Sequence, residues 1–171
     1  IKDEAGNEKT VESFDYYKAN NPKEYVIIMT DHLAELTGEK GLDPKGTIEK
    51  HSDNMRILRN RYNHIPVDVQ QQTAAQEGIQ NFDSSKLEPS LNGLGESKLT
   101  QRKANVVLGL YAPQRHEIQS YRGYDITRLK DNYRNLSILK YRNGISNVNT
   151  GLYFNGACNF FAELPKSKDM T

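Results

Sequence analysis

The chain lacks several features that mark common protein classes. A single cysteine, Cys158, excludes a disulfide framework and a cysteine-based zinc site and indicates a reducing compartment. No apolar run approaches the length of a membrane-spanning helix, and neither end resembles a signal peptide, so an integral membrane protein is excluded. The phosphate loop G-x-x-x-x-G-K-[ST] is absent from all 171 residues. No metal-ligand spacing links the four histidines, so we expect surface or packing roles for His32, His51, His64 and His116.

The charge of the chain is nearly balanced but unevenly spread. The net charge is +1 at pH 7, and Leu, Ile, Val and Phe make up 38 of the 171 residues, which is enough for one folded domain with a sizeable core. Residues 1–50 carry seven basic and eleven acidic side chains, whereas residues 102–142 carry nine basic and three acidic ones. A basic face for phosphates or nucleic acid would explain this asymmetry, and so would a surface that meets an acidic neighbour such as another copy of the chain.

Apolar runs and helical spacing predict a β-α-β unit in the first half of the chain. Residues 25–29 form a continuous apolar run, which is typical of a central strand in a parallel sheet that helices cover on both faces. A helix capped by Thr47 is expected next, because apolar side chains recur at helical spacing at Ile48, Met55, Leu58 and Tyr62. Residues 67–71 are expected to form the following strand.

The second half of the chain predicts further strands after an irregular stretch. Residues 73–103 have few apolar side chains, which is typical of a functional or disordered loop, and we expect only short helices near 75–80 and 97–102. Another buried strand is expected at 106–111, followed by short antiparallel strands at 136–141, 150–154 and 159–162. A type I′ turn at Asn155-Gly156 is expected between the last two. At the other end, Thr10 is expected to cap a helix that Asn21-Pro22 ends.

The order of these elements indicates the α/β class. We expect a doubly wound, mainly parallel sheet with antiparallel hairpins at the C-terminal end. In such sheets, ligands bind at the carboxyl ends of the strands.

Three groups of polar residues follow predicted strands. Asp31 follows the strand that ends at Thr30, and a carboxylate there holds the water shell of Mg²⁺ on a nucleotide or, equally well, caps the next element. Glutamines at 70–72 follow the next strand, where a neutral amide orients a γ-phosphate or its attacking water, although an ordinary polar loop has the same composition. Lys140 and Arg142 alternate on a strand, so both project from one face, where they clamp phosphate oxygens or, as edge charges, discourage aggregation.

In order and spacing, these segments resemble the later part of a RecA-type ATPase core, and most closely the DnaB-like family of hexameric replicative helicases. Residues 26–33 resemble that family's Walker B segment, and residues 67–72 resemble the strand that ends in its phosphate-sensing glutamine. Residues 104–108 resemble its Ala-Asp-hydrophobic strand, with Asn105 in place of the aspartate. Residues 140–144, Lys-Tyr-Arg-Asn-Gly, match its Lys-x-Arg-Asn-Gly motif. The resemblance covers about residues 24–165.

This resemblance implies a site for ATP and Mg²⁺ that two subunits of a ring share, and the ring is expected to be a hexamer. Asp31 would hold the metal with Thr30 beside it, and Gln72, or Gln71 in the other register, would contact the γ-phosphate. Arg142 with Lys140 would reach nucleotide on the neighbouring subunit. A bacterial or phage-infected cytoplasm is the expected location.

The resemblance also implies contacts with single-stranded DNA. The loop after the glutamine strand would face the central channel of the ring. Its candidate cations for the DNA phosphates, which are equally explained as solvated surface charges, are Lys86, Lys98, Arg102 and Lys103.

In addition, the resemblance implies that the ATPase core continues outside this chain. The Walker A loop and the catalytic glutamate of the family would precede Asp31, but the 30 residues before it contain no such loop. We therefore expect a single RecA-like domain fragment, with a helix and linker at 1–23, an incomplete core at 24–165 and a tail at 166–171. Such a fragment would hydrolyse ATP only as part of the full-length protein.

Three other functions fit the same residues. A recombinase-like or KaiC-like ATPase shares the strand order and a related basic motif, and a filament rather than a closed ring would distinguish it. A non-hydrolysing assembly protein on the same scaffold would explain the missing phosphate loop. A plain nucleic-acid-binding module is supported by the basic segment 102–142 alone.

Overall fold

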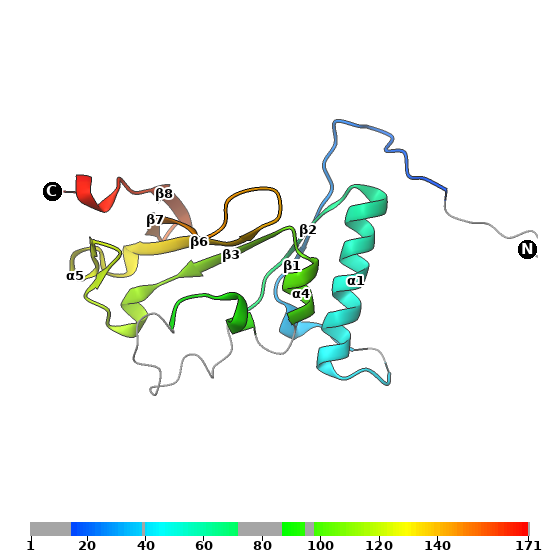
Figure 1. Cartoon of the computed structure of the whole chain (residues 1–171), viewed down its shortest axis with the longest axis horizontal. Helices are drawn as coiled ribbons and strands as arrows, with labels where there is room; N and C mark the ends of the chain where they lie inside the picture. Colours follow the sequence, from blue (N-terminus) through cyan, green and yellow to red (C-terminus); the bar gives the residue numbers. More distant parts are fainter. Residues whose placement is uncertain (1–14, 39, 72–86, 95–97, 171) are drawn as a thin grey trace, which may run out of the picture.

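The computed structural model describes residues 15–38, 40–71, 87–94 and 98–170. Two helices, α1 and α4, lie beside one another at one end of the molecule, and an antiparallel sheet extends to the other end (Figure 1). The α-helices are α1 (Pro44–Tyr62), α4 (Lys98–Lys103) and α5 (Ile126–Leu129). The strands are β1 (Ile27–Thr30), β2 (Ile65–Asp68), β3 (Val106–Tyr111), β4 (Ser120–Tyr121), β5 (Tyr124–Asp125), β6 (Tyr133–Tyr141), β7 (Val148–Asn155) and β8 (Phe160–Glu163). Short 3₁₀ helices occur at Leu33–Glu35, Leu91–Leu94, Pro113–His116, Lys130–Asn132 and Ser167–Asp169.

The expected β-α-β unit is confirmed. Strands β1 and β2 pair in parallel, with Ile27 opposite Ile65 and Thr30 opposite Asp68, and α1 connects them. Helix α1 begins earlier than Thr47, because the side chain of Asp43 accepts a hydrogen bond from the Gly46 amide at 2.7 Å and proline occupies the first helical position. The helix ends at Asn63, whose left-handed backbone (φ 55°) terminates the helical hydrogen bonding.

The remaining strands are antiparallel, so a mainly parallel sheet was the wrong expectation. Strand β3 pairs with β6, and the sheet has the order β3-β6-β7-β8, while β4 and β5 form a separate hairpin. The three C-terminal strands occur as expected, but β3 joins their sheet rather than the parallel pair. An apolar run such as 106–111 indicates that a strand forms, but it does not specify the direction of the partner strand.

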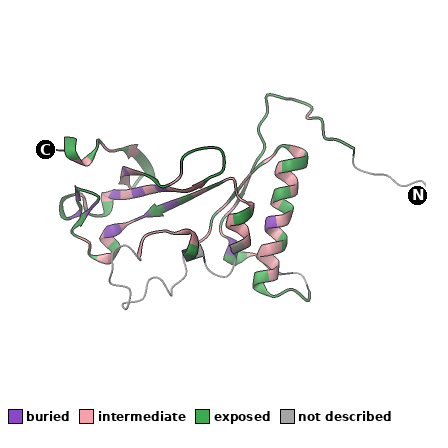
Figure 2. Ribbon diagram, viewed as in Figure 1, coloured by how far each residue is buried: buried purple, intermediate pink, exposed green. Residues whose placement is uncertain are grey.

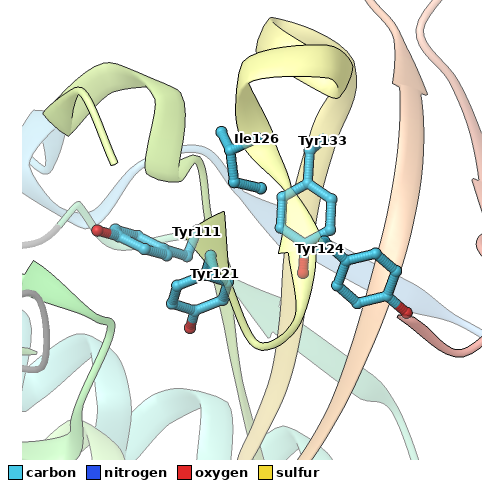
Figure 3. Packing of buried hydrophobic residues seen from close by; sticks show 5 residues of the cluster. All are labelled: Tyr111, Tyr121, Tyr124, Ile126 and Tyr133. Carbon is cyan, nitrogen blue, oxygen red and sulfur yellow. The ribbon is translucent and has the colours of Figure 1, made fainter. Parts of the chain in front are cut away.

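A cluster of aromatic side chains forms the core at the α5 end of the antiparallel sheet (Figures 2 and 3). Tyr133 and Ile126 are completely buried, and the rings of Tyr111, Tyr121 and Tyr124 pack around them. Burial raises the pKa of Tyr121 to about 12, so this ring stays neutral at all physiological pH values. In the neighbouring strand β7, Gly151 leaves room for a tyrosine ring, because a Cβ atom there would lie 2.7 Å from Cζ of Tyr124.

The outward face of the parallel pair and of β3 remains apolar and exposed. Helix α1 packs against β2, and its His51 contacts Thr30 and Asp68 on the covered face. The alternate side chains point away from α1, and no described residue buries them. The exposed side chains are Ile27, Met29, Ile65, Val67, Val106, Leu108 and Leu110. The expectation of strands buried on both faces is therefore wrong for the described residues, because helices cover only one face.

Two local expectations also differ from the structure. Residues 15–20 are not helical, so the expected N-terminal helix is wrong over that part, and its beginning lies outside the described residues. The link between β7 and β8 spans residues 156–159, which is longer than a type I′ turn, and the residue with positive φ is Asn159 (φ 50°). The short helix expected near 97–102 occurs as α4, whereas the one near 75–80 lies outside the described residues.

We expect the substitution Ile126→Ala to lower the free energy of unfolding of the chain by about 3 kcal/mol, because it leaves a cavity in the tyrosine cluster. The matched control Ile145→Ala, at a side chain that is 77% exposed, should change it by less than about 0.5 kcal/mol. Urea unfolding measured by circular dichroism tests both. Equal effects of the two substitutions would contradict the assignment of the core.

Candidate functional site

The carboxyl ends of β1 and β2 lie side by side, as the sequence predicted for a shared site. The Val69 amide donates to the Thr30 carbonyl at 2.9 Å, and the Leu33 amide donates to the Val69 carbonyl at 3.0 Å, so the pairing continues beyond both strands. Asp31 follows β1 directly, and Gln71 follows β2 after two intervening residues. The structure therefore brings a carboxylate and an amide segment to one edge, while Gln72 lies outside the described residues.

Asp31 is exposed, and the residues after it fix its backbone. Leu33 is 1% exposed and begins a short 3₁₀ helix, which anchors the chain immediately after Asp31. His32 Nε2 lies 3.8 Å from Glu35 Oε1 and leaves the Asp31 carboxylate open to solvent. An exposed carboxylate on a rigid strand end is suited to an ion that arrives with a ligand.

His51 of α1 contacts the last residue of each of these strands, a role that the sequence did not reveal. Its Nε2 lies 2.9 Å from Asp68 Oδ1 and 3.4 Å from Thr30 Oγ1. The side chains of His51 and Asp68 are only 14% and 17% exposed. The available signal was the position of His51 between Ile48 and Met55 on the apolar stripe of the predicted helix, which places it against the strands.

Lys140 and Arg142 lie at the end of β6, where both bind the C-terminal carbonyl groups of α4. Lys140 Nζ donates to the carbonyls of Gln101 and Arg102, and the Arg142 guanidinium donates to the Arg102 carbonyl at 3.1 Å. The backbone amide of Arg142 also donates to the Asn105 carbonyl at 2.9 Å. The two predicted phosphate-binding cations are thus brought together and held on one helix end.

A third cation, Arg59 of α1, joins this group. Its guanidinium donates to the Lys103 carbonyl at 2.7 Å and to Asn105 Oδ1 at 3.2 Å. Desolvation, followed by repulsion from Arg142 and Arg59, lowers the pKa of Lys140. Like charges therefore face one another here, and the hydrogen-bond partners that hold them are carbonyl groups and one amide oxygen. Asn105, which replaces the aspartate of the resembled motif, supplies that oxygen.

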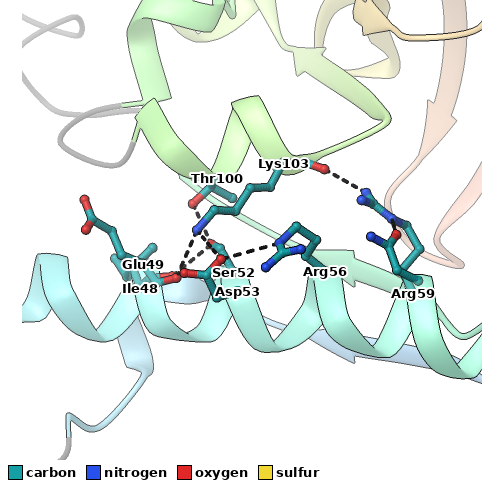
Figure 4. Close-up of polar contacts among 9 residues, drawn as sticks. Ile48, Glu49, Ser52, Asp53, Arg56, Arg59, Thr100 and Lys103 are labelled. Carbon is teal, nitrogen blue, oxygen red and sulfur yellow. Dashed lines mark hydrogen bonds and ion pairs between the residues drawn. The ribbon is translucent and has the colours of Figure 1, made fainter. Parts of the chain in front are cut away.

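The cations predicted to bind DNA have different surroundings (Figure 4). Lys103 Nζ lies 2.9 Å from Asp53 Oδ1, and this hydrogen bond with Lys103 is the main reason that the pKa of the Asp53 carboxyl is lowered. Ser52 Oγ lies 3.0 Å from Thr100 Oγ1 and ties the same two helices together. The side chain of Arg102 is exposed. Lys86 and the side chain of Lys98 lie outside the described part of the chain, so these DNA contacts stay predictions.

The acidic edge and the cationic group are separated along α1. His51 contacts the ends of β1 and β2, whereas Arg59, eight residues later, contacts the cationic group. At 1.5 Å per residue, these two positions are about 12 Å apart along the helix axis. One copy of the chain therefore presents the two groups at different places.

Among solved structures, two share this arrangement of elements. The ATPase domain of a DnaB-like helicase superposes with a TM-score of 0.69 at 22% sequence identity, over 85% of this chain and 46% of that one. The fold is that of a DnaB-like ATPase domain. A second structure, a DnaB-like replicative helicase described with its interactions with primase, gives a TM-score of 0.68 at 22% identity, over 85% of this chain and 32% of that one. The resemblance read from the sequence is thereby confirmed for the fold.

The chain spans less than half of either DnaB-like relative. No protein-family model and no curated protein matches the sequence. Among the described residues, no helix is both long and apolar enough to cross a membrane.

We expect the substitution Lys140→Met to raise the hydrogen-exchange rate of the Ala104 amide, which bonds to the Thr100 carbonyl at 3.0 Å, about two- to fivefold. The substitution removes a cation that binds the last carbonyl groups of α4. Exchange followed by NMR tests this, with Lys130→Met on a different element as the control. Equal rates in both variants would show that Lys140 does not stabilise α4.

Proposed function

We infer that the chain forms part of the ATPase core of a ring-forming replicative DNA helicase, which couples ATP hydrolysis to movement along single-stranded DNA. One observation carries this function: in a fold of the DnaB-like ATPase type, Asp31 and the glutamine segment occupy the same edge of a parallel strand pair. In open sheets of parallel strands, ligands bind outside this edge.

The residues at the edge fit a nucleotide that carries Mg²⁺. Among the described residues, no group of three His, Cys, Asp or Glu side chains could hold a metal ion alone. A single exposed carboxylate such as Asp31 suits Mg²⁺, which keeps much of its water shell and takes its other ligands from nucleotide phosphates. Bound Mg²⁺-ATP supplies the phosphoryl group for hydrolysis. Asp31 would orient the metal's water shell, and Gln71 or Gln72 would orient the attacking water by neutral hydrogen bonds.

Lys140 and Arg142 act on the nucleotide of a neighbouring copy. The distance along α1 between the acidic edge and the cationic group supports an action between subunits rather than within one. Backbone carbonyls hold these side chains in place but leave their positive charge uncompensated. A guanidinium and an ammonium supplied in this way stabilise the negative charge that develops on the transferred phosphoryl group.

Contact with DNA is proposed for the segment that ends in α4. Arg102 is exposed, whereas the charge of Lys103 is paired with Asp53, so Arg102 is the stronger described candidate for a phosphate contact. The carbonyl of Arg102 also accepts hydrogen bonds from Lys140 and Arg142. A movement of α4 along the DNA would therefore shift the two cations that face the neighbouring nucleotide.

The exposed apolar face is the proposed contact for the part of the core that carries the phosphate loop. Strands β2 and β3 each have one unpaired edge within the described residues, and alternate side chains of both strands are apolar and exposed. An uncovered face of this kind indicates a missing layer, because sheets with parallel strands are normally covered on both faces. A segment with an apolar strand and amphipathic helices would cover it.

A non-hydrolysing assembly protein on the same scaffold remains the second candidate. The observation that favours it is the absence of a phosphate loop in the 171 residues. A protein of this kind would bind nucleotide or a partner at the same edge without turnover.

We expect the substitution Arg142→Ala in the assembled ATPase to lower DNA-stimulated hydrolysis about a thousandfold or more, because the charge on the neighbour's nucleotide is no longer stabilised. Nucleotide affinity should change less than about threefold. Steady-state hydrolysis and equilibrium binding of a fluorescent nucleotide test this, with Arg128→Ala on α5 as the matched control.

Two results would contradict the proposal. An equal loss of binding and turnover would place Arg142 at its own subunit's nucleotide. Binding without turnover in the unchanged assembly would favour the non-hydrolysing alternative.

We expect Met29→Lys and Leu108→Lys to change the free energy of unfolding of the 171-residue chain by less than about 0.5 kcal/mol, because both side chains are exposed there. In the assembled ATPase, the same lysines would be buried without partners and hydrolysis should fall to background. Ile145→Lys, at an exposed side chain of the β6–β7 loop, should be neutral in both settings. Normal assembly of the Met29 and Leu108 variants would show that this face stays uncovered.

A further inference from the structure

The polar contact of His51 joins three elements at one point. Thr30 and Asp68 are the last residues of β1 and β2, and they lie directly opposite one another in the parallel register. One ring nitrogen of His51, on α1, is within 2.9 Å of the Asp68 carboxylate and 3.4 Å of the Thr30 hydroxyl. A carboxylate oxygen only accepts hydrogen bonds, so this nitrogen carries the proton that is donated. The helix is thereby connected to both strands immediately before Asp31.

The shielding of this group from water makes its geometry strict. The His51 and Asp68 side chains are 14% and 17% exposed, so water replaces the contact poorly. Removing the imidazole would leave a partly buried carboxylate without its donor, and the strand end would have to move to solvate it.

The opposite end of β2 shows that a histidine against α1 need not act in this way. His64 precedes β2 and packs against the rings of Tyr17 and Tyr62, with ring centres 6.2 Å and 5.9 Å away. Its Nδ1 is buried without a hydrogen-bond partner. His64 thus serves as an aromatic packing residue at the amino end, whereas His51 makes polar contacts at the carboxyl end that leads to Asp31.

We propose that His51, through Asp68 and Thr30, is a positioning residue that sets the separation between Asp31 and the glutamine segment, and with it the affinity of the site for nucleotide-bound Mg²⁺. This role depends on the function proposed above. The hydrogen bonds of the Val69 and Leu33 amides continue the pairing beyond Thr30 and Asp68, so any shift of these two residues passes directly to Asp31 and Gln71. Groups that orient a metal-binding carboxylate change metal affinity or activity about 10- to 100-fold when removed.

The first measurement uses the 171-residue chain alone. In the variant His51→Leu, the exchange rates of the Leu33 and Val69 amides should rise at least about tenfold. The Ile65 amide, which bonds to the Val26 carbonyl at 2.8 Å at the other end of the pair, should keep its rate. His64→Leu is the matched control and should give the reverse pattern. His51→Gln retains a donor for Asp68 and should restore most of the protection.

The second measurement follows hydrolysis in the assembled ATPase. His51→Leu and Asp68→Asn should raise the Mg²⁺ concentration for half-maximal hydrolysis about tenfold or more, whereas His51→Gln and His64→Leu should stay within about threefold of the unchanged protein. The KM for ATP at saturating Mg²⁺ should change little in all four. A structural role alone would lower the amount of folded enzyme without altering the Mg²⁺ dependence.

Each result decides the proposal. Local exchange changes together with a shifted Mg²⁺ dependence support it. An unchanged Mg²⁺ dependence in His51→Leu, with or without faster exchange, overturns it and leaves the proposed ATPase function intact. An unchanged assembly that binds Mg²⁺-ATP without hydrolysing it overturns the proposed function, and this inference with it.

Discussion

The parallel pairing of β1 and β2 is the constraint on which the candidate site depends. In an antiparallel pair, the residues after the two strands would lie at opposite ends, but here Asp31 and Gln71 follow strands that end at the same edge. The crossover through α1 is what a parallel connection requires, and it places one helix across both strands. Asp31, the glutamine segment and the His51 contact are neighbours only because of this pairing.

The chain divides its tasks between two kinds of sheet. The parallel pair carries the polar residues but has few buried side chains, whereas the antiparallel sheet holds the tyrosine cluster that stabilises the fold. The apolar face left open on β1, β2 and β3 is stable only where another layer covers it. The position of the site at the boundary of an uncovered core explains why this chain has an edge for a nucleotide but no phosphate loop to complete it.

The sequence predicted those features that depend on local periodicity. The helical spacing from Ile48 to Tyr62 and the apolar run before Asp31 predicted α1 and β1, and the alternation of Lys140 and Arg142 placed both on one strand. The antiparallel direction of β3 was not predictable in the same way, because an apolar run carries no information on its partner. The pairing of His51 with Asp68 was hidden for a similar reason: it joins residues 17 positions apart whose meeting depends on how α1 packs.

The partners of the cationic group bear on how it acts. A carboxylate would have held Lys140 and Arg142 more strongly than a carbonyl, but it would also have cancelled the charge that a phosphate needs. Carbonyl groups at the end of α4 provide partial negative charge, which fixes the direction of the two side chains and leaves most of their charge unused. Because desolvation and mutual repulsion already lower the pKa of Lys140, an arriving phosphate would relieve repulsion as well as gain attraction. The cluster is therefore arranged for an anion that approaches from outside the chain, and the acidic edge about two helical turns away is not in a position to supply it.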